Sequence, residues 1–306
     1  MTLQQILYAI TISEHGSMNK AAEALFISQP SLTGAIKELE QETGIRIFLR
    51  TNKGVITTGE GEEFLIYARQ LYQQYDLMKQ KYIEKTAIKR KFGVSTQHYS
   101  FAVKAFVDTV KRFDMLKYEF AIRETKTAEV IKDVANFKSE IGILYLNDFN
   151  RKIIGKMLKD TGCKFTKLID CNAYVYIWKN HPLAKNSAIS FEELRDYPCL
   201  SFEQGENGSF YFAEEILSTN DYQRIIKTND RASMLNLMVG LNGYTLCSGI
   251  ICEELNGSDY IAVPYAADED NPNSSMEIGY IVKSDGRLSE IGRAYVDELT
   301  KYLKKI

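Results

Sequence analysis

The chain has 306 residues, of which 45% are hydrophobic and 25% are charged. These values exclude disordered, collagen-like and fibrous chains, and the length predicts two domains, or three if one is small. The 38 basic and 40 acidic residues nearly cancel, so a nucleic-acid site would have to be local. The five cysteines are scattered without zinc-ligand spacing, which favours a reducing cytoplasm and predicts no metal and no other cofactor.

The N-terminal part of the chain is predicted to be almost wholly helical, and two of its helices follow each other closely. Ser17 can cap a helix through Phe26, and Ser28 can cap the next helix, which carries Pro30 in its first turn and ends at Gly44. Two helices joined by so short a turn form a helix-turn-helix, whose second helix places its N-terminal side chains against base edges of DNA.

The residues after Gly44 are predicted to form a short hairpin, or wing, that would meet phosphates or the minor groove. Helical geometry turns Thr33 and Lys37 away from the buried stripe of the second helix. A generic three-helix interaction module is the alternative, because basic and acidic residues balance over residues 1–58. The candidate DNA contacts are Ser17, Lys20, Ser28, Gln29, Pro30, Ser31, Thr33, Lys37, Arg50, Thr51 and Lys53.

A further predicted helix, within residues 60–88, carries apolar residues at alternating spacings of four and three. This spacing is that of a heptad seam, so we expect a dimerisation helix. The alternative is that the helix packs on its own domain. The predicted seam residues are Phe64, Ala68, Leu71, Tyr75, Met78 and Tyr82.

From residue 89 onward the pattern changes to short strands that alternate with helices, which predicts α/β architecture with largely parallel sheets. An uncharged stretch from Ala232 to Cys252 is long enough to cross a bilayer. Asn242 and Gly243 interrupt it, so we expect a helix that ends there and a buried strand from Tyr244 to Cys247, with no membrane span. The predicted strands are Phe92–Thr96, Tyr118–Arg123, Glu140–Tyr145, Ala173–Trp178, Cys199–Phe202 and Met276–Val282.

Polar side chains gather where several of these strands end, which is where open α/β sheets bind ligands. The densest cluster follows the first strand, where the start of a helix favours an anion. For any one of these residues a simple capping role is the alternative. The candidate ligand contacts are Ser95, Thr96, Gln97, His98, Ser100, Thr125, Tyr145, Ser201, Glu203 and Ser248.

Enzymatic motifs are absent from the sequence: it contains no G-x-S-x-G elbow, no H-E-x-x-H helix and no Walker loop. We therefore expect no catalytic residues. Trp178 and the tyrosines at 174 and 176 alternate along one predicted strand, which indicates sheet packing.

The N-terminal run SMNKAAEALFISQPSLT, from Ser17 to Thr33, resembles the LysR-type transcriptional regulators. The likeness continues through Ile36, Leu39, Glu40, Gly44, Phe48, Arg50, Thr58, Gly61, Phe64 and Leu65. Gly34 departs from the family, in which many members carry a longer polar residue.

The resemblance implies a winged helix-turn-helix over 1–59, a linker and dimerisation helix over 60–88, and an effector-binding domain over 89–306. That domain would be α/β, like periplasmic binding proteins, with lobe I at about 89–161 and 268–306 and lobe II at about 162–267. A small effector would bind between the lobes. The run from Ser95 to His98 is similar to the sulfur-assimilation branch of the family, which implies a polar or anionic effector.

The resemblance further implies a cytoplasmic regulator that binds double-stranded promoter DNA, forms homodimers or homotetramers and meets RNA polymerase. Cys199 lies where peroxide-sensing relatives keep a reactive cysteine, but no resolving partner follows it, so we expect Cys199 and Cys247 to be buried structural residues. Two rival interpretations stay open: a metabolite-binding or enzymatic α/β protein with an accessory helical domain, and a repressor that needs no ligand.

Overall fold

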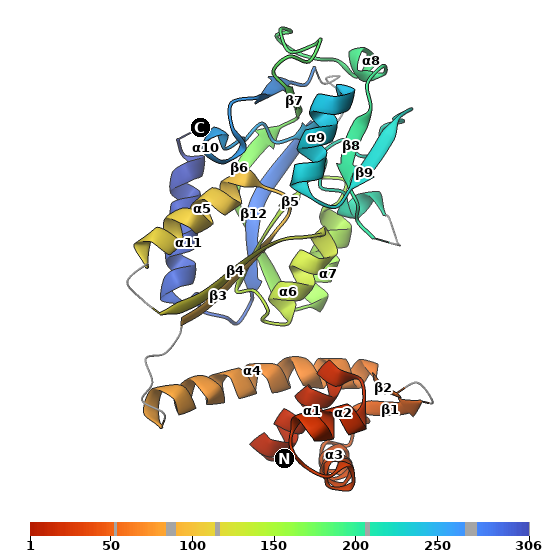
Figure 1. The fold of residues 1–306 in the computed structure, drawn as a ribbon, viewed down its shortest axis with the longest axis vertical. Coiled ribbons are helices and arrows are strands. Elements are labelled where there is room, and N and C mark those ends of the chain that lie inside the picture. Colours follow the sequence, from red (N-terminus) through yellow and green to blue (C-terminus); the bar gives the residue numbers. More distant parts are fainter. Residues whose placement is uncertain (52–53, 84–89, 114–116, 206–208, 267–273, 306) are drawn as a thin grey trace. The chain divides into compact units, whose positions relative to one another are not determined.

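The structure is a computed structural model that describes residues 1–51, 54–83, 90–113, 117–205, 209–266 and 274–305. The chain divides into two compact units, Met1–Ile88 and Lys89–Ile306. Figure 1 shows the first unit in red to orange and the second in yellow to blue. Each unit has a hydrophobic core of its own.

The first unit is a bundle of helices with a two-stranded wing. Ser17 and Ser28 cap α2 and α3 by accepting the backbone N–H groups of Lys20 and Ser31, and Gly44 ends α3 in the left-handed conformation that glycine favours. These caps match the sequence prediction. The elements are α1 (Leu3–His15), α2 (Met18–Ala24), α3 (Gln29–Thr43), β1 (Phe48–Thr51), β2 (Gly54–Thr57) and α4 (Gly59–Tyr82).

The small side chains of α2 let the helices of this unit approach closely. Ala21 and Ala22 are buried together with Leu32 and Leu39 of α3. The start of α4 is just as tight, because a Cβ atom on Gly61 would come within 2.2 Å of the Ile47 carbonyl oxygen. Only glycine fits at this position, so the wing and α4 are held against each other.

The predicted seam of α4 is wrong for its first two residues. Phe64 and Ala68 pack into the core of their own unit, and Ala68 is only 4% exposed. Farther along, Leu71, Met78 and Tyr82 are 45%, 60% and 68% exposed. The apolar residues do share one face of α4. The helix-turn-helix core covers the first two turns of this face, and its exposed part begins at Tyr67.

The second unit has two lobes, the first of which is built on a five-stranded sheet of order β4-β3-β5-β12-β6. β3 pairs in parallel with β4 and β5, and β12 runs antiparallel to β5 and β6. Helices α5 and α11 cover one face and α6 and α7 the other, as Figure 1 shows. The elements are β3 (Arg90–Thr96), α5 (Ser100–Arg112), β4 (Tyr118–Glu124), α6 (Thr127–Ala135), β5 (Ile141–Leu146), α7 (Arg151–Asp160), β6 (Cys163–Asn172), β12 (Ser275–Lys283) and α11 (Glu290–Leu303).

The second lobe has a three-stranded sheet of order β10-β7-β11 and a parallel pair of β8 and β9. A bridge between Cys199 and Tyr244, the residue before β10, joins β8 to the edge of the three-stranded sheet. Helix α9 packs on this lobe through Met234 and Met238. The elements are β7 (Tyr174–Trp178), α8 (Phe191–Leu194), β8 (Cys199–Phe202), η1 (Phe210–Phe212), β9 (Ile225–Thr228), α9 (Arg231–Leu241), β10 (Thr245–Cys247), α10 (Glu253–Asn256) and β11 (Tyr260–Pro264).

The chain passes between the lobes later than the expected crossover near Thr161. Residues 163–172 form β6, which pairs with β12 and belongs to the sheet of lobe I. The crossover lies at Ala173, between β6 and β7. β6 was not predicted, because this edge strand alternates exposed lysines with half-buried apolar residues and has no continuous apolar run.

The uncharged stretch from Ala232 to Cys252 folds as predicted, into a helix and a buried strand. Helix α9 ends at Leu241, Asn242 takes the left-handed conformation of a helix cap, and β10 follows at once. In the described part of the chain, no helix is long and apolar enough to span a membrane.

Candidate DNA-binding surface and effector cleft

The N-terminus of α3 presents a set of small polar side chains that are already ordered. Gln29 Nε2 donates to Thr33 Oγ1 at 2.8 Å, and the hydroxyls of Ser28 and Ser31 lie 2.7 Å apart. Pro30, Ser31 and Lys37 are exposed. The side chains predicted to read bases are therefore held in one arrangement by contacts within the helix.

The wing is tied to α3 by a carboxylate. Glu40 Oε1 accepts the backbone N–H groups of Ile47 and Phe48 at 2.8 and 3.0 Å. Arg50 lies in β1 opposite Val55, and the exposed Thr51 donates from its hydroxyl to the Gly54 carbonyl.

Of the predicted DNA contacts Lys20 and Lys53, only Lys20 lies within the described residues. Lys53 lies outside them, whereas Lys20 is exposed in the first turn of α2. Ser17, which caps α2, is half-buried.

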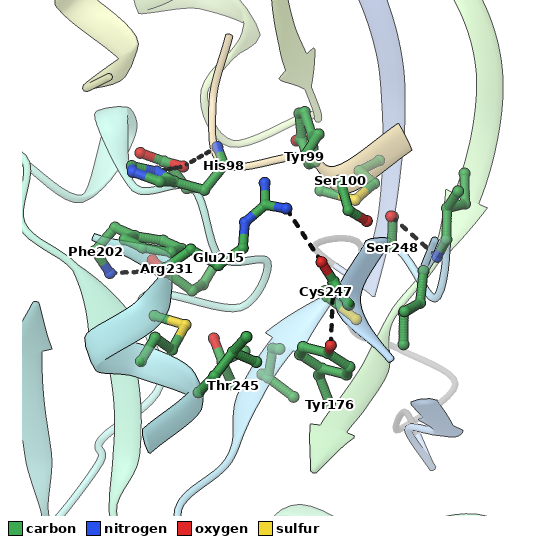
Figure 2. Close-up of a pocket in the computed structure, with 18 residues that line it drawn as sticks. His98, Tyr99, Ser100, Tyr176, Phe202, Glu215, Arg231, Thr245, Cys247 and Ser248 are labelled. Carbon is green, nitrogen blue, oxygen red and sulfur yellow. Dashed lines mark hydrogen bonds and ion pairs between the residues drawn. The ribbon is translucent and has the colours of Figure 1, made fainter. Parts of the chain in front are cut away.

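A cleft lies between the two lobes of the second unit, and the space within and at its mouth, open solvent included, is about 690 Å³. Figure 2 shows His98, Tyr99 and Ser100 of lobe I on one side and Tyr176, Phe202 and Thr245 of lobe II around it. The remaining lining residues are Glu214, Glu215, Arg231, Met234, Leu235, Leu246, Cys247, Ser248, Ile250, Ile251, Asn256 and Met276.

Three of the predicted ligand contacts line this cleft: His98, Ser100 and Ser248. The His98 ring stacks on Phe202 with centroids 3.7 Å apart. Ser100 accepts the Cys252 N–H at 3.1 Å, which leaves its own hydroxyl hydrogen available for a ligand. The turn between β3 and α5 was therefore located correctly, although only part of it faces the cleft.

Ser95, Thr96 and Gln97 do not line the cleft but are fully buried within lobe I. Ser95 donates to Asp133 Oδ2 at 2.6 Å, and Gln97 donates to Thr127 Oγ1 at 2.6 Å. The reason is that β3 lies between β4 and β5, with helices on both faces of the sheet. Side chains at its end point into the layers that cover it.

The other four predicted contacts lie elsewhere. Thr125 donates its backbone N–H to the Thr96 carbonyl, and the Tyr145 hydroxyl donates to the Ala213 carbonyl at 3.1 Å. Ser201 lines a neighbouring cavity of about 620 Å³, and Glu203 is exposed beside α9. Thr125 and Tyr145 thus support the structure around the cleft.

Acidic and basic side chains of the two lobes pair across the cleft. Glu214 Oε2 lies 2.8 Å from His98 Nδ1, and Arg231 of lobe II pairs with Glu124 of lobe I. Burial raises the pKa of Glu124, and Arg231 opposes that shift. Burial, reinforced by Glu214, raises the pKa of Glu215 to about 8, so the Glu215 carboxyl is mostly protonated at neutral pH.

Several cleft residues were missed by the sequence analysis. Arg231 Nη1 donates to Asn256, whose amide in turn donates to the Tyr176 hydroxyl, as the dashed lines in Figure 2 show. Arg231 opens α9 directly after β9, so the rule that ligands bind at strand ends could have found it. Glu214 and Glu215 carry no such local signal. Tyr176 packs in the core as predicted, yet it also reaches the cleft.

The cysteines near the cleft are not activated. Burial raises the pKa of the Cys199 thiol far above its usual range and that of Cys247 to about 12. Both thiols therefore stay protonated at neutral pH. Cys199 is buried as expected, whereas Cys247 is only half-buried and lines the cleft.

Comparison with known proteins identifies both units. Residues 3–62 match the family model of bacterial regulatory helix-turn-helix proteins of the LysR family, and residues 97–304 match the LysR substrate binding domain. The chain belongs to the LysR family. It is therefore a LysR-type DNA-binding transcriptional regulator with an effector-binding domain, and its family is one of regulators rather than enzymes.

Curated relatives and a solved structure agree with this assignment. The chain is 27% identical over 205 residues to the transcriptional regulator AlsR of Bacillus subtilis, a match that covers 66% of this chain and 64% of AlsR. It is 25% identical over 285 residues to YbhD of Escherichia coli, covering 92% and 85%. A full-length OxyR C199D variant from Pseudomonas aeruginosa matches with a TM-score of 0.63 at 17% identity, covering 99% and 95%. This likeness confirms the predicted fold class.

Proposed function

We propose that this LysR-type regulator reads promoter DNA with α3 and the wing, and that a small molecule bound between the lobes of the second unit sets its activity. The observation that carries the second part is the cleft, because both lobes supply its lining residues. A ligand that contacts both lobes stabilises one arrangement of them over others, which is how binding becomes a signal.

On the DNA side we assign base reading to Gln29, Ser31 and Thr33. Gln29 and Thr33 are joined by a hydrogen bond, so together they present a fixed pattern of donors and acceptors to base edges in the major groove. Phosphate contacts are assigned to the exposed cation Lys37 and to three residues of the predicted wing, Arg50, Thr51 and Lys53.

We further propose that two copies pair through the exposed apolar side chains of α4. Tyr67, Leu71 and Met78 are 63%, 45% and 60% exposed, and their spacing along α4 puts these three large apolar side chains on one face of the helix. A two-fold dimer would place two α3 helices on a pseudo-palindromic site. Such a dimer, or a tetramer built from it, would act in the cytoplasm on promoter DNA and would contact RNA polymerase there.

The experiment begins with duplexes selected from a random pool by the full-length protein. Binding of the selected duplex should weaken steeply with salt, as expected when cations neutralise phosphates. A panel of small metabolites is then screened for a rise in Tm and for a change in affinity for that duplex. Salt-independent binding, or failure to enrich any duplex, would refute the DNA-reading part of the proposal.

A pair of substitutions on α9 tests whether the cleft is the effector site. Leu235→Trp would fill the cleft and should abolish the response to any effector found. Val239→Trp is the matched control, because Val239 is 44% exposed on the same helix and does not line the cleft. A response that survives Leu235→Trp would place the effector site elsewhere.

A further inference from the structure

The turn between β3 and α5 forms an anion site, and a carboxylate of the same chain already fills it. Glu214 Oε2 accepts both the backbone N–H of His98 and a contact from His98 Nδ1, each at 2.8 Å. Gln204 Nε2 donates to the other oxygen, Oε1, at 2.9 Å. The side chains of His98 and Glu214 are only 6% and 5% exposed, so water does not compete for these contacts.

Glu214 is brought to this turn by a segment of lobe II that lies on lobe I. Thr127 of lobe I donates its hydroxyl to the Phe212 carbonyl at 2.8 Å, and Phe212 packs against the lobe I core. The rings of Phe149 and Tyr211 stack with centroids 4.5 Å apart. Because several neighbours of Glu214 are docked independently, its carboxylate is held in the anion site by more than its own contacts.

The other basic side chain of the cleft, Arg231, also has an acidic partner within the chain. Arg231 is paired with Glu124 across the lobes and donates to Asn256. Among the described lining residues, His98 and Arg231 are the basic ones, and each faces a carboxylate of the opposite lobe. A ligand carboxylate would thus be desolvated without a free cation to receive it, which is strongly unfavourable.

We propose that Glu214 is a built-in anionic ligand of the cleft, and that the remaining space takes an uncharged, partly apolar effector. This inference rests on the proposed function of the cleft and chooses between the polar and anionic effectors that the sequence left open. The apolar wall for such a molecule is formed by Met234, Leu235, Leu246, Ile250 and Ile251. Hydrogen-bonding groups are supplied by Ser100, Tyr176 and Thr245.

The test removes the internal carboxylate and offers a free one. Glu214→Ala deletes a methylene and a carboxylate, a group that acetate closely matches. The full-length variant should melt roughly 5–10 °C below the wild type, because buried donors lose their acceptor. Sodium acetate should restore much of that loss in a saturable way, and phenylacetate should do so at lower concentration because its ring meets the apolar wall. Sodium chloride at equal ionic strength should not.

The matched control is Glu203→Ala, which removes an exposed carboxylate from the same stretch of chain. Neither the wild type nor this control should gain stability from acetate or phenylacetate beyond the chloride effect. Stabilisation of the wild type by either anion would overturn the proposal, since the site would then be open. An unchanged Tm in Glu214→Ala, or a loss that neither anion repairs, would overturn it as well.

A second variant covers the case in which Glu214→Ala fails to fold. Glu214→Gln keeps the volume and one acceptor oxygen but removes the charge, so its Tm should fall and acetate should have no effect, because no space is vacated. An unchanged Tm in this variant would refute the role of the charge. None of these melts uses DNA or an effector, so their outcome is independent of the experiments on the proposed function.

Discussion

Replacing Thr33 by Val would remove a hydroxyl from the proposed reading face of α3 while keeping the side-chain shape. Thr33 Oγ1 accepts from Gln29 Nε2 at 2.8 Å, and this bond holds the Gln29 amide in one orientation. A hydrogen bond of this kind contributes a net of about 0.5–1.5 kcal/mol, which corresponds to a loss of about 2- to 13-fold in affinity for the selected duplex. Binding to a shuffled duplex should change much less, because phosphate contacts are untouched.

Lys37→Ala is the matched control on the same helix, since Lys37 is exposed and is assigned a phosphate contact and no base contact. It should weaken binding to both duplexes and reduce the slope of log affinity against log salt by about 0.9. The ratio of wild-type to variant affinity would then change about 3.5-fold between roughly 50 and 200 mM salt.

Fluorescence anisotropy measures the affinity of each variant for the labelled selected duplex and for the labelled shuffled duplex, each at the two salt concentrations. The reasoning would be refuted if Thr33→Val weakened binding to both duplexes equally. It would also be refuted if that variant altered the salt slope, because Thr33 would then be acting through the backbone of the DNA.

Further substitutions address the other assignments. If α4 pairs two copies as proposed, Leu71→Asp should convert the dimer to a monomer in sedimentation experiments, whereas Gln73→Asp, at an exposed polar position off the face of Tyr67, Leu71 and Met78, should not; equal behaviour would reject the seam. Because the folded-state pKa of Glu215 is about 8, above its ordinary 4.5, the folded protein should lose stability as pH rises between these values, and Glu215→Gln should flatten that loss in melts at pH 5 and 8. Ser95→Ala should lower Tm by a few degrees through the lost contacts with Asp133 and Ser139, yet leave effector binding intact; a lost response with unchanged Tm would contradict its placement. Cys199 should resist alkylation in the native protein and react only after unfolding, so rapid labelling would show that its thiol is accessible.

The helix-turn-helix unit was predictable because its signals are local. Ser17, Ser28 and Gly44 act within one helical turn of their own positions, and the apolar stripe of α3 needs only the helical period. The stripe of α4 shows the limit of such reasoning. A heptad pattern reveals that Phe64, Ala68 and Leu71 share a face, but not that the core of the same unit covers the first two and leaves the third exposed.

The cleft between the lobes shows the same division between local and long-range information. The order of strands and helices correctly located the turn at His98, because strand ends follow from the local pattern. Whether Ser95 faces the cleft or the interior depends on the neighbours of β3 in the sheet, which come from distant parts of the chain.

The partner of His98 lies 116 residues away along the chain, at Glu214. No periodicity or cap relates the two positions. Chain folding brings the lobe II segment around Phe212 onto lobe I, and only that packing turns a buried glutamate into the anion that the turn between β3 and α5 attracts. Local chemistry thus specified that an anion belongs at this turn, whereas long-range packing determined that the protein supplies it itself.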